Sequence, residues 1–126
     1  MSSHWVDHYR THGYAVVPRV FDAGEIAALA LEFDRIYAEG LAFGRSFRLQ
    51  NSFFALTDDA ALGPIVRMVQ WPSYFNRTLE RFRRDPRMLE ILAPLIGRDL
   101  KQIINQLHWK PPGAAMAEFG FHQDSR

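Results

Sequence analysis

The sequence contains no cysteine among its 126 residues. Disulfide bonds and thiolate ligands are therefore excluded, and any metal site has to use histidine, aspartate or glutamate. An excess of one charge is also missing, because 15 lysines and arginines stand against 14 aspartates and glutamates, for a net charge of +1. Such a balance gives no overall field that would attract nucleic acid or an anionic membrane.

Long apolar runs are absent as well. The longest, from Ile26 to Leu31, is far shorter than the roughly 20 residues that cross a bilayer, and the N-terminal residues lack a signal-peptide apolar region. The sequence shows no internal repeat, no glycine-rich phosphate loop and no Ser-His-Asp order. We therefore expect a soluble, cytoplasmic protein without a nucleic-acid or membrane partner.

The composition is that of a folded protein, with 48% hydrophobic and 13% aromatic residues. A chain of this length corresponds to about one domain with a packed core. We expect a single partial domain over residues 1–126. Residues 1–99 are expected to be mainly helical, with one or two strands, and residues 100–126 to form the first strands of a core.

Helices are predicted where capping residues precede apolar residues at helical spacing. The clearest begins at Asp22, for which Glu25 completes a capping box, and ends at Gly40. Another begins at Asp85, with proline at its first position, and ends at Gly97. The other predicted helices span His4 to His12, Asp58 or Asp59 to Val69, and Ser73 to Arg83.

Strands are predicted from β-branched, aromatic and alternating residues. They span Tyr14 to Pro18, Arg48 to Ala55, Asp99 to Trp109, and the closing stretch around His122. In the third of these, the even-numbered residues are the more polar set, so one face suits a polar cofactor or simply solvent. Helices and strands together predict an α+β fold.

Three histidines follow helical spacing near the N-terminus, at His4, His8 and His12. Histidines four residues apart on a helix can share a metal ion. The structural alternative is a polar stripe on a helix that buries Trp5 and Val6, and we favour it. A run of arginines from Arg77 to Arg87 likewise allows an anionic substrate, although a solvated helix face is the favoured interpretation.

His122 and Asp124 stand two residues apart near the end of the sequence. In an extended strand, such residues point to the same face. An imidazole and a carboxylate held in this way supply two of the three ligands of the facial triad that binds Fe(II) in non-haem oxygenases. The pair therefore indicates a metal site, for which a third ligand is not evident.

Several motifs in a fixed order give the chain a resemblance to a known family. They are the segments 13–18 (GYAVVP), 21–26 (FDAGEI), 85–87 (DPR), 110–113 (KPPG) and 122–124 (HQD). In this order they resemble the landmarks of the phytanoyl-CoA dioxygenase family, over nearly the whole chain.

The resemblance implies an Fe(II)- and 2-oxoglutarate-dependent dioxygenase that hydroxylates a small-molecule substrate with O2, giving succinate and CO2. It implies a helical N-terminal region before a double-stranded β-helix, or jelly-roll, core. His122 and Asp124 match the family's metal-binding pair, and Lys110 matches a lysine near the 2-oxoglutarate. Without the resemblance, Lys110 would be an ordinary residue at the end of a strand.

The family's distal histidine and its 2-oxoglutarate-binding arginine have no counterpart in the sequence. His108 is a conceivable substitute ligand, but a structural role suits it better. We therefore expect an incomplete jelly roll, no complete set of catalytic residues, and a truncated chain that is inactive in isolation. The alternative is a non-catalytic soluble α+β interaction domain in which the His122 and Asp124 spacing is coincidental.

Overall fold

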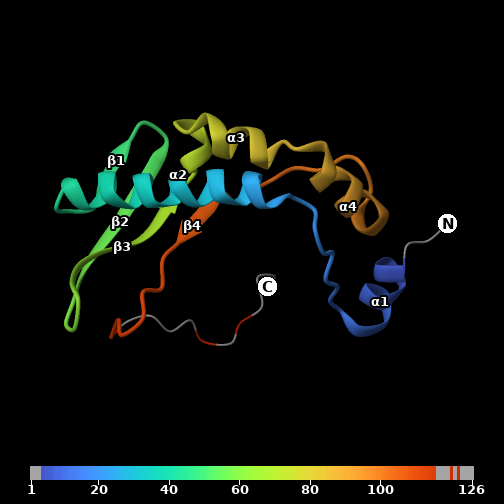
Figure 1. Cartoon of the computed structure of the whole chain (residues 1–126), viewed down its shortest axis with the longest axis horizontal. Coiled ribbons are helices and arrows are strands. Elements are labelled where there is room, and N and C mark those ends of the chain that lie inside the picture. Colours follow the sequence, from blue (N-terminus) through green and yellow to red (C-terminus); the bar gives the residue numbers. More distant parts are fainter. Residues whose placement is uncertain (1–3, 116–119, 121, 123–126) are drawn as a thin grey trace.

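The computed structural model describes residues 4–115, Gly120 and His122. These residues form an α+β fold, as predicted, in which one long helix packs against an antiparallel sheet (Figure 1). The helices of this part are α1 (His4–His12), α2 (Ala23–Ala42), η1 (Pro72–Tyr74, a 3₁₀ helix), α3 (Arg77–Arg83) and α4 (Pro86–Ile96). Its strands are β1 (Phe47–Leu49), β2 (Ser52–Asp59), β3 (Gly63–Gln70) and β4 (Gln106–His108). None of these helices is long and apolar enough to cross a membrane.

The strands pair in chain order into an open antiparallel sheet, and three of them precede residue 99. One row of side chains crosses the sheet on the face that packs into the core. It consists of Phe47, Phe54, Val69 and Leu107. Side chains alternate along a strand, so the next row lies on the opposite face. It consists of Arg48, Phe53, Gln70 and Gln106.

Helix α2 covers the core face of the sheet (Figure 1). Its predicted capping box is confirmed: the Asp22 carboxylate accepts a hydrogen bond from the Glu25 backbone N–H, and the Glu25 carboxylate accepts one from the Asp22 N–H, both at 2.8 Å. Ile36, in the middle of the helix, is 1% exposed and belongs to the core. The long helix thus positions the sheet through one apolar face.

Gly40 does not end α2 as predicted, since the helix continues to Ala42. Instead, this glycine marks the closest approach of the helix to the sheet. A Cβ atom at this position would lie 2.8 Å from Cγ2 of Val66 and 3.2 Å from Cδ1 of Phe54. Only a residue without a side chain fits between these two buried neighbours.

The helix predicted from Asp58 or Asp59 to Val69 is wrong, because these residues form a β-hairpin of β2 and β3. The Asp59 carboxylate caps the hairpin turn rather than a helix. It accepts hydrogen bonds from the backbone N–H groups of Ala61, at 2.9 Å, and Leu62, at 3.2 Å. An aspartate that binds the backbone two or three residues on is as typical of a turn as of a helix start.

The strand predicted from Tyr14 to Pro18 is also wrong, because the segment lies outside the sheet as an irregular connection between α1 and α2. Tyr14 and Val16 are 60% and 77% exposed. A β-prone sequence forms a strand only where a neighbouring strand pairs with it. No strand of the described part lies beside this segment.

The remaining strand predictions are shifted. The segment predicted from Arg48 to Ala55 belongs to two strands, β1 and β2, joined by a turn in which Gln50 has a φ of 52°. Of the strand predicted from Asp99 to Trp109, only Gln106–His108 is present. Its neighbour β3 turns away at Trp71, whose φ is also 52°, so the residues before Asn105 have no strand beside them.

The helices predicted from His4 to His12 and from Asp85 to Gly97 are confirmed as α1 and α4. Asp85 caps α4 by accepting a hydrogen bond from the Arg87 N–H at 2.9 Å, and Gly97 follows its last residue. The helix predicted from Ser73 to Arg83 is divided into η1 and α3. The division occurs because Asn76 adopts an extended conformation and caps α3, accepting from the N–H of Leu79 at 3.0 Å.

Candidate functional site

Strand β4 presents polar groups on one side and core groups on the other, as its alternation predicts. Leu107 and Trp109 pack against the core, and the Trp109 ring lies 5.5 Å from that of Tyr37 in α2. Gln106 and His108 are exposed on the opposite face, where His108 Nε2 and Gln106 Oε1 are 3.1 Å apart. His108 therefore belongs to a polar pair on the sheet surface.

Lys110 lies two residues after the end of β4, where the packing of Trp109 on α2 fixes the course of the chain. The Trp109 N–H donates to the Arg67 carbonyl at 3.1 Å, which extends the contact with β3 by one residue beyond the strand. Lys110 is exposed and lines a cavity of about 350 Å³ together with Asp34 and Tyr37 of α2. The lysine is thus placed at the end of the polar strand, beside the helix that covers the sheet.

The backbone carbonyl of Gly120 fixes the tautomer of His122. His122 Nδ1 lies 2.8 Å from this oxygen. A carbonyl oxygen only accepts hydrogen bonds, so Nδ1 carries the proton and, in the neutral ring, Nε2 carries the lone pair. A backbone acceptor on one ring nitrogen is the arrangement that typically orients a histidine for metal binding through the other nitrogen.

Asp124, the predicted second ligand, lies outside the described residues. Of the predicted closing strand, Gly120 and His122 are described, and neither is in a strand. Within the described part, no three histidines, aspartates or glutamates come together as a possible metal site. This includes the row of His4, His8 and His12, because its ends are two helical turns, or roughly 12 Å, apart.

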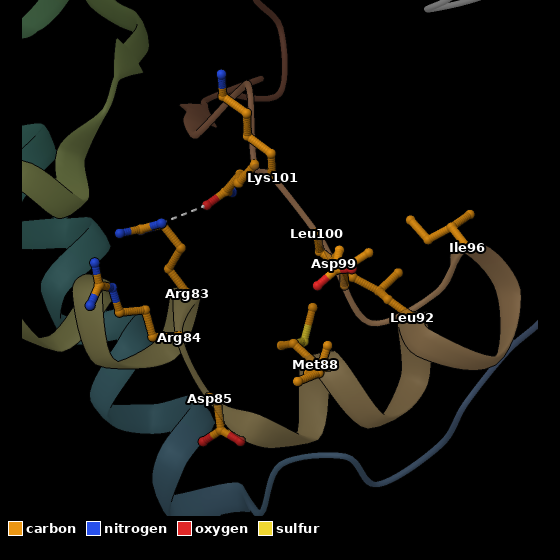
Figure 2. Close-up of a pocket in the computed structure, with 11 residues that line it drawn as sticks. Arg83, Arg84, Asp85, Met88, Leu92, Ile96, Asp99, Leu100 and Lys101 are labelled. Carbon is orange, nitrogen blue, oxygen red and sulfur yellow. Dashed lines mark hydrogen bonds between the residues drawn. The ribbon is translucent and has the colours of Figure 1, made fainter.

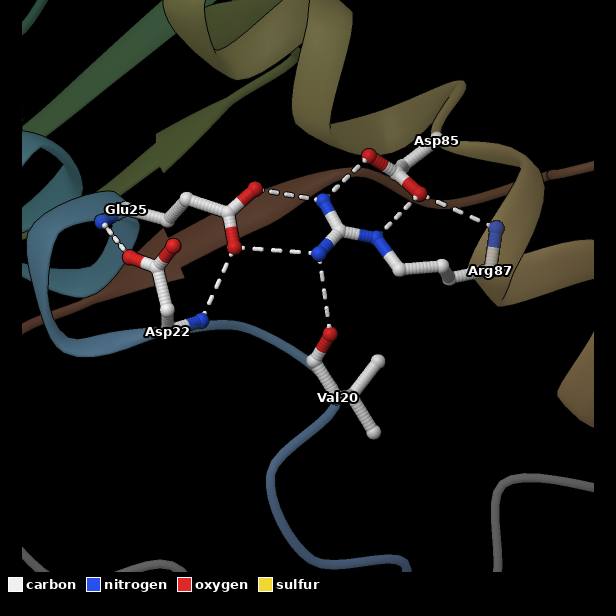
Figure 3. Close-up of polar contacts among 5 residues, drawn as sticks. All are labelled: Val20, Asp22, Glu25, Asp85 and Arg87. Atoms are coloured by element: carbon white, nitrogen blue, oxygen red, sulfur yellow. Dashed lines mark hydrogen bonds and ion pairs between the residues drawn. The ribbon is translucent and has the colours of Figure 1, made fainter.

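A cluster around Arg87 is the most connected polar feature of the structure, and sequence reasoning missed it (Figure 3). The guanidinium donates two hydrogen bonds to the Glu25 carboxylate, of 2.5 and 3.0 Å. It donates two more to the Asp85 carboxylate, both of 2.8 Å. It also donates to the Val20 carbonyl at 3.0 Å and lies 4.4 Å from the centre of the Phe21 ring. Glu25 and Val20 are far from Arg87 in the sequence, so no local spacing indicates the cluster.

The charges of this cluster stabilise one another. Hydrogen bonds from the Arg87 side chain and backbone lower the pKa of Asp85 to about 2. The Arg87 side chain and the Asp22 N–H lower the pKa of Glu25 as well, and the two carboxylates raise the pKa of Arg87. The cluster therefore holds the start of α2 and the start of α4 together and has no protonation change near neutral pH.

Two further arginines of the run are also engaged by an acidic residue. Arg83 and Arg84 both contact Glu80, at 2.8 and 2.7 Å, and the hydrogen bond from Arg83 lowers the pKa of Glu80. Three of the arginines between 77 and 87 are thus paired with carboxylates inside the helical layer. Their pairing supports the structural interpretation of this run over an anion-binding one.

A cavity of about 470 Å³ lies between α3, α4 and the segment before β4 (Figure 2). Its wall is apolar and consists of Met88, Leu89, Leu92, Ile96 and Leu100. Charges of both signs stand at its rim: Arg84 and Asp85 are already paired, and the Lys101 side chain extends away from the apolar wall.

Comparisons of the chain with models of protein families, with curated proteins and with solved structures found no match. The functional proposal therefore depends on the residues and the geometry described above.

Proposed function

We propose that the chain contains the metal-binding part of an Fe(II)- and 2-oxoglutarate-dependent dioxygenase that resembles the phytanoyl-CoA dioxygenase family. The main support is the fixed tautomer of His122, two residues before Asp124, after a sequence of motifs in the order of that family. In this tautomer the neutral imidazole can bind a metal ion through Nε2.

The donor set suits Fe(II). His122 offers Nε2 and Asp124 a carboxylate oxygen, and two or three such ligands leave the other positions of the ion open to cosubstrate and O2. Bound Fe(II) and 2-oxoglutarate would supply the oxidative decarboxylation that drives hydroxylation of a small-molecule substrate. The Gly120 carbonyl would orient the imidazole ring and, in the neutral ring, leave the lone pair on Nε2.

Lys110 is the candidate residue for 2-oxoglutarate. Its ammonium group extends from the end of β4, a strand whose course is fixed by Leu107 and Trp109 in the core. A lysine on a rigid strand end provides a point charge for a carboxylate of the cosubstrate. Gln106 and His108 are exposed on the polar face of β4, whereas Lys110 lines the cavity beside Asp34 and Tyr37 of α2.

In our proposal, the four-stranded sheet is the first part of a jelly-roll core. One face is covered by α2 and the other presents polar groups, as a cofactor-binding concave face requires. The outer edge of β4 has no strand beside it within the described residues, and the preceding Ile103 and Ile104 are 73% and 58% exposed. Further strands of a jelly roll would pair with this edge and cover these side chains.

Anaerobic titration with Fe(II) tests the proposed metal ligands. His122→Ala and Asp124→Ala are each expected to lower the affinity for Fe(II) at least about tenfold. His108→Ala is the matched control, because His108 is an exposed histidine engaged by Gln106, and it should leave the affinity unchanged. Equal Fe(II) affinity of the wild-type chain and both ligand variants would refute the proposal.

The second candidate function is a non-catalytic interaction domain, favoured by the open edge of β4 beside exposed isoleucines. An open strand edge binds an extended segment of another chain by backbone hydrogen bonds. In this case the chain binds no Fe(II) at His122 and associates through β4. Sedimentation of the wild-type chain and an Ile103→Glu variant would show association that this substitution removes.

A further inference from the structure

Two histidines of α1 are in ring contact at the end of the molecule opposite the sheet (Figure 1). The ring centres of His8 and His12 are 4.4 Å apart. The two residues are one helical turn apart, on the same face of α1. Among the described residues, no ring contact of His4 is found, although it stands at the same spacing from His8.

The pair is held in place by the turn that follows α1. Gly13 has a φ of 79°, and its N–H donates to the Tyr9 carbonyl at 2.7 Å, so the chain reverses direction directly after His12. This reversal brings the Tyr14 ring edge-on to His8, at 4.9 Å, and to within 6.5 Å of His12. Two imidazoles and a phenol thus form one group, built by the helix and its C-terminal turn.

We propose that His8 and His12 form a two-histidine binding site for a divalent transition-metal ion of the Cu²⁺, Ni²⁺ or Zn²⁺ group. Neutral imidazole nitrogens are preferred ligands of these ions. Rings already in contact need only side-chain rotation to direct one nitrogen each toward a shared ion, and water completes the coordination. The Tyr14 ring packs edge-on against His8 at 4.9 Å.

The site is independent of the proposed iron site. It uses α1 rather than the strand end and the His122 region, and it lacks a carboxylate ligand. Imidazole sites bind Fe(II) less tightly than Ni²⁺ or Cu²⁺ in the usual order of stability of divalent ions. Failure of either site in experiment would therefore leave the other proposal standing.

Calorimetric titration with Ni²⁺ at slightly alkaline pH, where imidazole is neutral, measures the affinity of the site. His8→Ala and His12→Ala are each expected to weaken Ni²⁺ binding by about tenfold or more. His4→Ala is the matched control and should leave it unchanged. The electron paramagnetic resonance spectrum of the Cu²⁺ complex should show two equivalent nitrogen ligands, and either single variant should remove one of them.

Alanine is the best helix former, so the variants of α1 keep their helix, which circular dichroism verifies. Ni²⁺ binding that persists undiminished in His8→Ala or His12→Ala would overturn the proposal. An equal loss in His4→Ala would overturn it as well, because a diffuse row of histidines rather than the contacting pair would then bind the ion.

Discussion

Glu25 and Arg87 face each other across 62 positions of sequence, with two hydrogen bonds of 2.5 and 3.0 Å between the carboxylate and the guanidinium. The same Glu25 carboxylate accepts the Asp22 N–H and completes the capping box of α2. One side chain therefore stabilises a helix end and binds that end to another helix. A planar guanidinium suits this role, because it binds two carboxylates in fixed directions.

Replacement of Arg87 should lower the thermal stability of the chain. Arg87→Ala leaves Glu25 and Asp85 without their shared cation, and Arg87→Lys should recover only part of the loss because an ammonium cannot bind both carboxylates in the same geometry. Thermal unfolding followed by circular dichroism measures the change. Arg84→Ala is the control: its side chain is 73% exposed in its pair with Glu80, so the midpoint should hardly move.

The stability of the chain should fall in acid through Asp85. Its pKa is lowered from 3.8 to about 2 by Arg87, so the folded state favours the ionised carboxylate. The stabilisation is complete above the unfolded value of 3.8 and is lost as the pH falls toward 2. Urea unfolding between these values should show a smaller pH dependence for Asp85→Asn, which keeps a capping side chain but cannot ionise. Equal slopes for the two proteins would contradict the pairing.

Gly40→Ala should destabilise the fold. The added methyl gains about 1 kcal/mol of helix propensity, but it meets Val66 and Phe54, which are 0% and 1% exposed and have no room to move. Overpacking costs about 1 to 3 kcal/mol, so the net loss is expected at about 1 kcal/mol. Urea unfolding of Gly40→Ala, Val66→Ala and the double variant tests the contact, since the double variant should be more stable than the sum of the single effects predicts.

Alanine substitutions of the two aspartates at the end of β2 should have very different effects on the free energy of unfolding. Asp59 is 3% exposed and accepts hydrogen bonds from two backbone N–H groups of the hairpin turn, so Asp59→Ala should cost about 1 to 3 kcal/mol. Asp58 is exposed, and Asp58→Ala should change the free energy of unfolding by less than about 0.5 kcal/mol. Similar effects of the two substitutions in urea unfolding would be evidence against this turn.

Lys110→Ala should weaken 2-oxoglutarate binding by about tenfold and leave the Fe(II) affinity unchanged, because it removes one charged contact to a carboxylate and no metal ligand. Lys110→Arg should retain part of the affinity. Lys101→Ala serves as the control for the loss of an exposed lysine. Calorimetry with 2-oxoglutarate in the presence of Fe(II) under anaerobic conditions measures all three, and equal affinities of Lys110→Ala and Lys101→Ala would exclude the proposed role.

The helix starts at Asp22 and Asp85 could be predicted from the sequence because their signals are local. A capping side chain binds backbone groups two or three residues away, so the residues that decide the structure are neighbours in sequence. The alternation of polar and apolar residues in β4 could also be predicted, because it too is a local pattern in the sequence. The position of Lys110 after the strand could be predicted from the same pattern.

Strand β3 was mistaken for a helix because of a bulge. The register with β2 shifts between Ala55 and Leu56, so that Val69 pairs with Phe54 and Val66 pairs with Leu56. The shift places two valines three residues apart on the same face, which is a helical spacing. The pairing that reveals the strand depends on β2 and cannot be derived from the spacing within β3.

The Arg87 cluster and the contact of Gly40 with Val66 could not be predicted, since they join segments that only the tertiary fold brings together. The metal pair of His122 and Asp124 stays a prediction, because Asp124 lies outside the described residues. The tautomer of His122 is likewise a property of the folded backbone around Gly120.

The arrangement around Arg87 also determines how the helical layer opens. Opening the first turn of α2 removes the Glu25 carboxylate from Arg87, and opening the first turn of α4 removes Asp85 and Arg87 together. We therefore expect the two turns to fray as one cooperative unit. Their amide hydrogens, for example those of Glu25 and Arg87, should exchange with solvent at matched rates, and Arg87→Ala should separate the two rates.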